Sequence, residues 1–316
     1  MPSVRDTTRR GPSPAGARWW IVIAAFAWIA SQPVSPIEAH EKITERPATP
    51  SRVVSLAPSV TETLYALGLG EAVAGVTSFC VFPPQARAKP TVGGYVNPSY
   101  EAVFALNPDL VIGLPEHADI LARLSRAGLR TLGVRQGGVE EILASIETVG
   151  AACGRTSRAR QLARDTRARV ERVHASTSGA YRPRVLVCVG NNMGSEGITD
   201  IFVAGKGSFH HELLLLAGAR NAFAGQGPYR GVSLEAILVM DPDVIIDMVP
   251  EEGMRPASRR EILSSWKRLS ALGAVRHDRV YVMAKDYAVI PGPRFVDLLE
   301  DMADVIHQKG AGNGRP

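Results

Sequence analysis

The side chains best suited to hold a ligand lie in short stretches that combine aromatic residues with glycine and proline. These stretches are residues 78–84, 93–98, 190–193 and 225–230, and the pair 286–287 together with 291–294. We expect them to be loops at the carboxyl ends of parallel strands, where α/β proteins bind their ligands. Aromatic rings that face a cleft suit a large, flat and partly apolar ligand.

The chain lacks the common sequence motifs of catalysis. It has no Gly-x-Ser-x-Gly, no Gly-x-x-x-x-Gly-Lys-Ser/Thr and no His-Glu-x-x-His, and the segment around Lys206 lacks the strand-to-loop spacing of a phosphate loop. Three scattered cysteines, Cys80, Cys153 and Cys188, do not suffice for an iron–sulfur cluster. We therefore expect a binding protein and not an enzyme; a stand-alone sensor module of the same fold is the other possibility.

Two histidine-containing motifs raise the question of a metal site, namely His210-His211-Glu212 and Glu116-His117. Adjacent side chains on a helix point in different directions, so His210 and His211 do not chelate one ion as an i, i+4 pair would. Direct capture of a divalent cation is thus a minor alternative, and we predict no metal site.

Strands and helices alternate along both halves of the chain. In the first half we predict strands at 53–57, 72–77, 109–114 and 130–134, and helices at 59–67, 99–106, 118–127 and 139–152. In the second half we predict strands at 184–189, 243–249 and 280–284, and helices at 209–217, 233–240 and 293–307. This alternation is typical of parallel sheets with crossover helices, and it predicts two Rossmann-like α/β lobes at 52–154 and 180–308.

An internal repeat supports the division into two lobes. Residues 99–112 resemble residues 233–246 at a constant offset of 134 residues. Each copy reads as a serine-capped helix, a Pro-Asp turn and a buried strand, which indicates a duplicated architecture.

Between the halves, residues 155–178 contain no glycine or proline, and small or apolar residues recur at helical spacing while arginines cover the other faces. A helix of roughly 20 residues is about 30 Å long. We predict that residues 155–179 form one rigid helix that joins the lobes, with the ligand cleft between them.

The first 39 residues look like a secretion signal, because arginines up to Arg18 precede an apolar run at 19–30 that is too short for a comfortable membrane span. We expect export to the periplasm, a flexible segment at 40–51 and a disordered tail at 309–316. No cysteine ends the apolar run, so lipid attachment is not expected there. Much of the net charge of +5 comes from the arginines of the leader, and the chain has no cluster of aromatic and basic residues. We therefore expect no nucleic-acid partner.

Several segments resemble the periplasmic binding proteins for vitamin B12 and iron siderophores, the helical-backbone (class III) family of ABC importers. They are residues 52–68, 83–86, 92–95, 106–112 and 291–294, and the resemblance covers roughly residues 51–308. It implies two lobes joined by a rigid helix, a monomer, a small-molecule metal-chelate ligand, and a permease with its ATPase subunits as partners.

Within this family, residues 75–84 and 92–98 look most like the cobalamin-binding branch. The resemblance implies a cobalt corrinoid as ligand, with no resident cofactor. Tyr95 and Tyr229 stand where that branch has tryptophans, Phe202 matches a phenylalanine of its C-terminal lobe, and Asp286-Tyr287 match an acidic-aromatic pair. The expected ligand-binding set is Phe79, Cys80, Tyr95, Asn192, Phe202, Tyr229, Arg230, Asp286, Tyr287 and Arg294.

The alternative ligands are an iron siderophore or haem. Haem-binding relatives also use tyrosine, and Arg230 and Arg294 could serve a siderophore; Cys80 could be an axial ligand of cobalt. The resemblance further implies that one glutamate in each lobe, Glu101 and Glu235, docks on permease arginines. These two residues occupy equivalent positions of the internal repeat.

Overall fold

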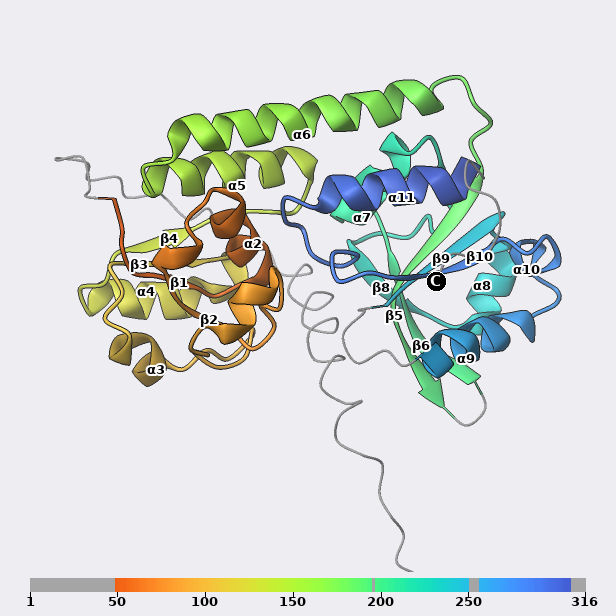
Figure 1. The fold of residues 1–316 in the computed structure, drawn as a ribbon. Helices are drawn as coiled ribbons and strands as arrows, with labels where there is room; N and C mark the ends of the chain where they lie inside the picture. The colour runs from red at the N-terminus through yellow and green to blue at the C-terminus, as the bar shows by residue number, and fades with distance from the viewer. Residues whose placement is uncertain (1–48, 195–196, 250–255, 308–316) are drawn as a thin grey trace, which may run out of the picture.

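The chain folds into two α/β lobes joined along one side by a single long helix (Figure 1). The structure, a computed structural model, describes residues 49–194, 197–249 and 256–307. The predicted signal at 1–39, most of the segment at 40–51 and the tail at 309–316 lie outside these residues. The two-lobed α/β architecture predicted from the alternation of strands and helices is confirmed.

The N-terminal lobe contains a parallel sheet in the order β2-β1-β3-β4. Its strands are β1 Val53–Ser55, β2 Val73–Val76, β3 Leu110–Gly113 and β4 Thr131–Gly133. Its helices are α2 Pro58–Ala66, α3 Tyr100–Ala105, α4 Ala118–Arg126 and α5 Val139–Ala152, with short 3₁₀ helices η1 Gly70–Ala72, η2 Pro84–Ala88 and η3 Pro115–His117.

Helices cover both faces of this sheet, because successive strand residues point to opposite sides. Val53 packs with the apolar residues of α2 and α5, whereas its neighbour Val54 packs with those of α3 and α4. Strands buried on both faces explain why the sequence shows apolar runs here in place of alternation. Because the four strands are parallel, their carboxyl ends all lie at one edge of the sheet.

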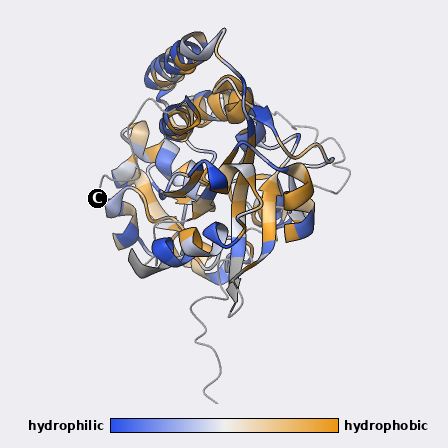
Figure 2. Ribbon diagram, turned by 90° about the vertical axis from the view of Figure 1, so that its right-hand side faces the viewer, coloured by the Kyte–Doolittle hydropathy of each residue, from blue (hydrophilic) through white to orange (hydrophobic). Residues whose placement is uncertain are grey.

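The C-terminal lobe has a mixed sheet in the order β10-β9-β5-β6-β8, with β7 beside β5. Its strands are β5 Arg184–Gly194, β6 Gly197–Ala204, β7 Arg220–Asn221, β8 Tyr229–Val232, β9 Val244–Val249 and β10 Val280–Ala284. Its helices are α7 Phe209–Leu216, α8 Leu234–Met240, α9 Pro256–Lys267, α10 Gly273–Arg276 and α11 Phe295–His307. Figure 2 views this lobe end-on and shows hydrophobic residues gathered on its strands.

Two expectations for this lobe are corrected. Residues 190–193 continue β5 as strand instead of forming a loop, and β5 turns back as the antiparallel strand β6. Tyr229 and Arg230 begin β8, which is antiparallel to β6, so the sheet is not purely parallel. The reason is that β6 pairs back on β5 as an antiparallel strand, with Ile198, Ile201 and Val203 buried along it.

The linking helix is α6, Thr156–Thr177, which runs along both lobes (Figure 1). Its arginines are not all solvated. Arg169 forms ion pairs with Asp297 at 2.6 Å and Glu300 at 2.5 Å on α11, while Arg158 donates to the Ala66 carbonyl at 2.9 Å. The helix is thus fixed to the C-terminal lobe through α11 and to the N-terminal lobe through α2.

Candidate ligand site between the lobes

The two lobes meet through α5 and α7. The main-chain N–H of Val139, at the start of α5, donates to Glu212 Oε2 on α7 at 2.7 Å. A Cβ on Gly138 would lie 2.6 Å from Glu212 Oε1, so any larger residue here would have to displace the Glu212 carboxylate. One buried apolar cluster contains residues of both helices, among them Ile142, Ile146, Phe209 and Leu213.

A second contact between the lobes is a buried ion pair. Arg294, just before α11, donates to Glu62 of α2 through Nη2 at 2.6 Å and Nε at 3.1 Å, and to Asp286 through Nη1 at 2.8 Å. The side chains of Arg294 and Glu62 are 17% and 4% exposed. The guanidinium also stacks on the Phe82 ring, with Cζ 3.4 Å from the ring centroid. Arg294 therefore joins segments 232 residues apart in sequence.

Three of the residues predicted to bind the ligand form contacts within the protein around Arg294. Arg294 and Asp286, both predicted to touch the ligand, form an ion pair with each other, and Arg294 forms a second one with Glu62. Tyr287 donates its hydroxyl to Asp301 of α11 at 2.7 Å. Glu62 was not among the predicted site residues; its signal in the sequence is a lone carboxylate on a helix face that is otherwise apolar or hydroxyl-bearing.

Tyr95 lies at the interlobe edge of the N-terminal lobe, and neighbouring groups fix it on several sides. Its ring is 4% exposed, and its hydroxyl donates to Glu116. Its carbonyl accepts a hydrogen bond from His117 Nε2 at 2.7 Å, while His117 Nδ1 accepts from the main-chain N–H of Leu114 at 3.1 Å. The pattern requires a neutral His117, consistent with burial lowering the pKa of this imidazole.

Tyr229 occupies the corresponding position in the C-terminal lobe. Its ring is 9% exposed, and its hydroxyl donates to Nδ1 of His210 at 3.2 Å. His210 Nε2 donates to the Ala288 carbonyl at 2.8 Å, so this imidazole is neutral as well. Burial lowers the pKa of His210 to about 4 and raises that of Tyr229.

The two tyrosines thus form matching Tyr–His pairs, one in each lobe. Tyr95 and His117 have ring centroids 5.0 Å apart, and Tyr229 and His210 have centroids 5.9 Å apart, both with an interplanar angle of 78°. Burial first, then Glu116, and to a smaller extent Cys80 and Tyr229, raise the pKa of Tyr95. Cys80 and Tyr229 therefore each lie within electrostatic reach of Tyr95, as expected of a site between the lobes.

Cys80 is buried in the same apolar cluster as Tyr95, and its thiol has a hydrogen-bond partner. Its thiol is 3% exposed and forms a hydrogen bond with Thr77 Oγ1 at 3.2 Å. Burial raises the pKa of this thiol, which keeps it protonated at neutral pH.

The remaining predicted ligand residues are less closely grouped. Phe79 and Phe202 are half-buried and pack against the apolar cluster that contains both tyrosines. Arg230 is exposed and donates to the Gln226 carbonyl at 2.9 Å, on the strand β8 that also carries Tyr229. The side chain of Asn192 lies outside the described residues.

The two predicted docking glutamates have the same local geometry. Glu101 and Glu235 are the second residues of α3 and α8, and the cap hydroxyls of Ser99 and Ser233 accept from the main-chain N–H three residues on, at 3.2 and 3.3 Å. The pKa of Glu101 is lowered by its own main-chain N–H and by Ser99; that of Glu235 is lowered by Ser233 and by its own main-chain N–H. Both glutamates are exposed and ionised at neutral pH.

The histidine motifs are occupied by other contacts. His210 is held by Tyr229 and Ala288, whereas His211 Nδ1 contacts Asn221 Nδ2 at 3.1 Å, so the two rings have separate partners. Across the described part of the chain, no group of three or more His, Cys, Asp or Glu residues is arranged to hold a metal ion. Among the helices described, none is both long and apolar enough to cross a membrane.

The sequence is similar to those of known binding proteins. The chain is 31% identical to the "Uncharacterized ABC transporter substrate-binding lipoprotein YvrC" of Bacillus subtilis, over 87% of this chain and 86% of that protein. The vitamin B12-binding protein of Vibrio cholerae is 26% identical over 81% of this chain and 89% of its own length.

Solved structures of the same architecture include proteins with different ligands. The vitamin B12-binding protein BtuF of Vibrio cholerae matches with a TM-score of 0.70 and 26% identity, over 83% of this chain and 99% of that one. A periplasmic heme-binding protein from Pseudomonas aeruginosa matches with a TM-score of 0.71 and 27% identity, over 84% and 96%.

The family signature spans most of the described chain. Residues 53–287 match the sequence model of the "Periplasmic binding protein" family, which confirms the resemblance seen in residues 52–68 and 106–112. The family match agrees with two lobes joined by one long helix: the chain belongs to the periplasmic binding protein family.

Proposed function

We propose that this chain captures a corrinoid between its lobes in the periplasm and delivers it to the permease of an ABC importer. The coarser role, a substrate-binding protein that works with permease and ATPase components, follows from the family and from the Bacillus relative. The observation that carries the finer proposal is the pair Tyr95 and Tyr229, one per lobe, each fixed by a buried neutral histidine. Two immobilised rings suit the faces of a flat macrocycle.

The way the rings are held favours recognition by shape. Each tyrosine hydroxyl already has a partner within its own lobe, Glu116 for Tyr95 and His210 for Tyr229. Both residues are buried, with 4% and 9% of their surface exposed, so a ligand would reach the rings only after the lobes part. A flat ligand would enter by parting the lobes at the tyrosines while α6 holds them together along the other side. Relatives described as vitamin B12-binding proteins support a corrinoid.

Haem is the second candidate, and one contact favours it. The Tyr95 hydroxyl donates to the Glu116 carboxylate, which could take the phenolic proton if the oxygen bound ferric iron. The likeness to a heme-binding structure from Pseudomonas aeruginosa supports this alternative.

Substitution of the two tyrosines separates the candidates. We expect Tyr95→Ala and Tyr229→Ala each to weaken aquocobalamin binding by about tenfold or more, because each removes a ring worth on the order of 1–3 kcal/mol of contact. Tyr95→Phe should bind aquocobalamin within about threefold of the wild type, since only the ring is needed. Isothermal titration calorimetry measures all three.

Tyr181→Ala is the control, because that ring is 73% exposed, just after α6. Unchanged aquocobalamin binding by both alanine variants would contradict the proposed site. Loss of haemin binding in Tyr95→Phe, with no aquocobalamin binding by the wild type, would assign the site to haem through a phenolate.

Export and docking complete the proposal. We infer that residues 1–39 direct the chain to the periplasm, that it acts there as a monomer without catalytic activity, and that Glu101 and Glu235 pair with permease arginines. The Bacillus relative is named a lipoprotein. Residues 1–48 of this chain contain no cysteine, so a lipid-modified cysteine in that stretch is not part of the proposal.

A further inference from the structure

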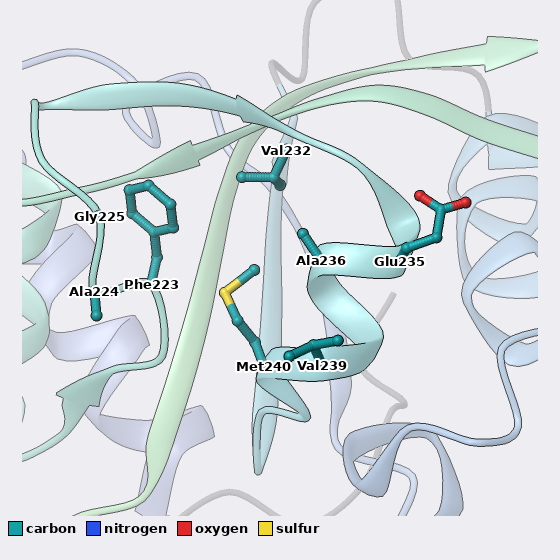
Figure 3. A pocket seen from close by; sticks show the side chains of 8 residues that line it. All are labelled: Phe223, Ala224, Gly225, Val232, Glu235, Ala236, Val239 and Met240. Atoms are coloured by element: carbon teal, nitrogen blue, oxygen red, sulfur yellow. The ribbon is translucent and has the colours of Figure 1, made fainter.

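An apolar pocket lies beside Glu235 on the surface of the C-terminal lobe (Figure 3). Its volume is about 450 Å³, enough for a large apolar side chain. Of the described residues that line it, Glu235 alone carries a charge, and the apolar lining includes Phe223, Gly225, Val232, Ala236, Val239 and Met240.

The Phe223 side of the pocket is closely packed. Figure 3 shows the Phe223 ring on one side, Met240 and Val239 of α8 on the other, and Val232 of β8 between them. The Phe223 ring is held between two glycines: a Cβ on Gly225 would lie 2.3 Å from its ring, and one on Gly205 would lie 3.0 Å from it. A preformed apolar wall loses little freedom when it binds a partner.

The pocket also leaves apolar surface in water. Val239 is 87% exposed although it is branched and apolar. In the internal repeat its counterpart in the N-terminal lobe is Ala105, whereas Glu235 and Glu101 are the same in both copies. The two duplicated helices thus share the glutamate, and the second adds an apolar residue beside it.

From this arrangement we propose that the pocket receives an apolar side chain of the permease, next to the cationic residue that pairs with Glu235. The inference rests on the proposed function and adds an anchor that is specific to the C-terminal lobe. Glu235 is ionised, forms no ion pair with another described residue, and sits at the pocket edge with its carboxylate directed away from Phe223 (Figure 3). The partner surface that fits is a basic residue followed closely by a leucine, methionine or phenylalanine side chain.

The test measures docking of the whole exported chain on the importer of its own organism, held in nanodiscs. We expect Val239→Asn to weaken docking by about tenfold, because burial of one branched apolar side chain is worth that order of affinity. Leu238→Asn is the matched control: it lies on the same helix, is 38% exposed and does not line the pocket, so docking should stay within about twofold. Aquocobalamin binding should be unchanged in both variants.

Each other outcome has a definite meaning. Wild-type docking by Val239→Asn, together with weakened docking by Glu235→Gln, would overturn the anchor and leave the proposed function standing. If the wild type docks on no importer, the proposed function fails, and the anchor with it. If ultracentrifugation shows a wild-type dimer that Val239→Asn abolishes, the pocket holds a second copy of the chain and the permease anchor is wrong.

Discussion

Arg294→Ala should lower the free energy of unfolding by about 3–5 kcal/mol, the usual cost of leaving a buried charge without its partner. The group left without its partner is Glu62, whose side chain is 4% exposed and which accepts two hydrogen bonds from Arg294. Burial raises the pKa of this carboxyl to about 7 although Arg294 lowers it, so the loss should be largest above pH 7, where Glu62 is ionised in the wild type. The variant also loses the contact with Asp286 and the stacking on Phe82. Because this network joins α2 to the segment before α11, the loss should also loosen the lobes.

Urea unfolding followed by tryptophan fluorescence measures the effect, since Trp266 is the one tryptophan after residue 48. Arg230→Ala is the control, because Arg230 is exposed and makes one hydrogen bond to a carbonyl. The double change Arg294→Leu with Glu62→Leu should recover most of the loss, since it removes both charges. A loss below about 1 kcal/mol in Arg294→Ala would show that the pair does not hold the lobes together.

The second large effect is a pH-dependent stability from Asp247 on β9. Asp247 is fully buried, and its carboxylate accepts from Trp266 Nε1 at 2.8 Å and from Asn191 Nδ2 at 2.9 Å. Burial raises its pKa from 3.8 to about 7, against the lowering effect of Trp266 and Asn191. The folded state therefore holds this proton more tightly than the unfolded state.

The sign of the effect follows from that difference. The stability that Asp247 contributes is fully present below pH ~4 and is lost as the pH rises to about 7, a change of about 4 kcal/mol. Asp247→Asn stays neutral and removes this dependence. Chemical unfolding at pH 4 and pH 8 gives the free energy of unfolding of both proteins, and the variant should gain stability relative to the wild type by that amount at pH 8. Taking the difference between the two proteins cancels the titration of all other groups. An equal gap at both pH values would mean that Asp247 does not titrate in this range.

The sequence predicted the elements that depend on local pattern. Apolar runs marked the four strands of the N-terminal lobe, and helical spacing without glycine or proline marked residues 155–178, found as α6 at Thr156–Thr177. The repeat at 99–112 and 233–246 predicted two serine-capped helices, which the structure has at α3 and α8. These features are set by residues within a few positions of one another.

Features that depend on distant partners were not predictable in this way. Glu62 and Arg294 are 232 residues apart, so no local pattern could pair them. Tyr95 and His117 are 22 residues apart, and they meet because β3 brings the segment after it, which carries His117, beside the loop that carries Tyr95. The sequence predicted a loop that carries Tyr95 at the carboxyl ends of the strands, but it could not show which residues hold the ring.

The strands β6 and β8 were missed for a different reason. Residues 197–204 are short and mix polar with apolar residues, because Thr199 and Asp200 face solvent while Ile198 and Ile201 are buried. Such a segment resembles a loop until its hairpin partner is known. A parallel sheet was therefore predicted for both lobes, and only the N-terminal lobe has one.

The most direct test of the account is a visible absorption titration of the exported chain with aquocobalamin, and with haemin in parallel. The account predicts saturable one-to-one binding of aquocobalamin, tighter than that of haemin, with the lobes closing on the corrin ring at Tyr95 and Tyr229. Saturable binding of haemin with no binding of aquocobalamin or of a base-free corrinoid would contradict corrinoid capture and assign the same site to haem.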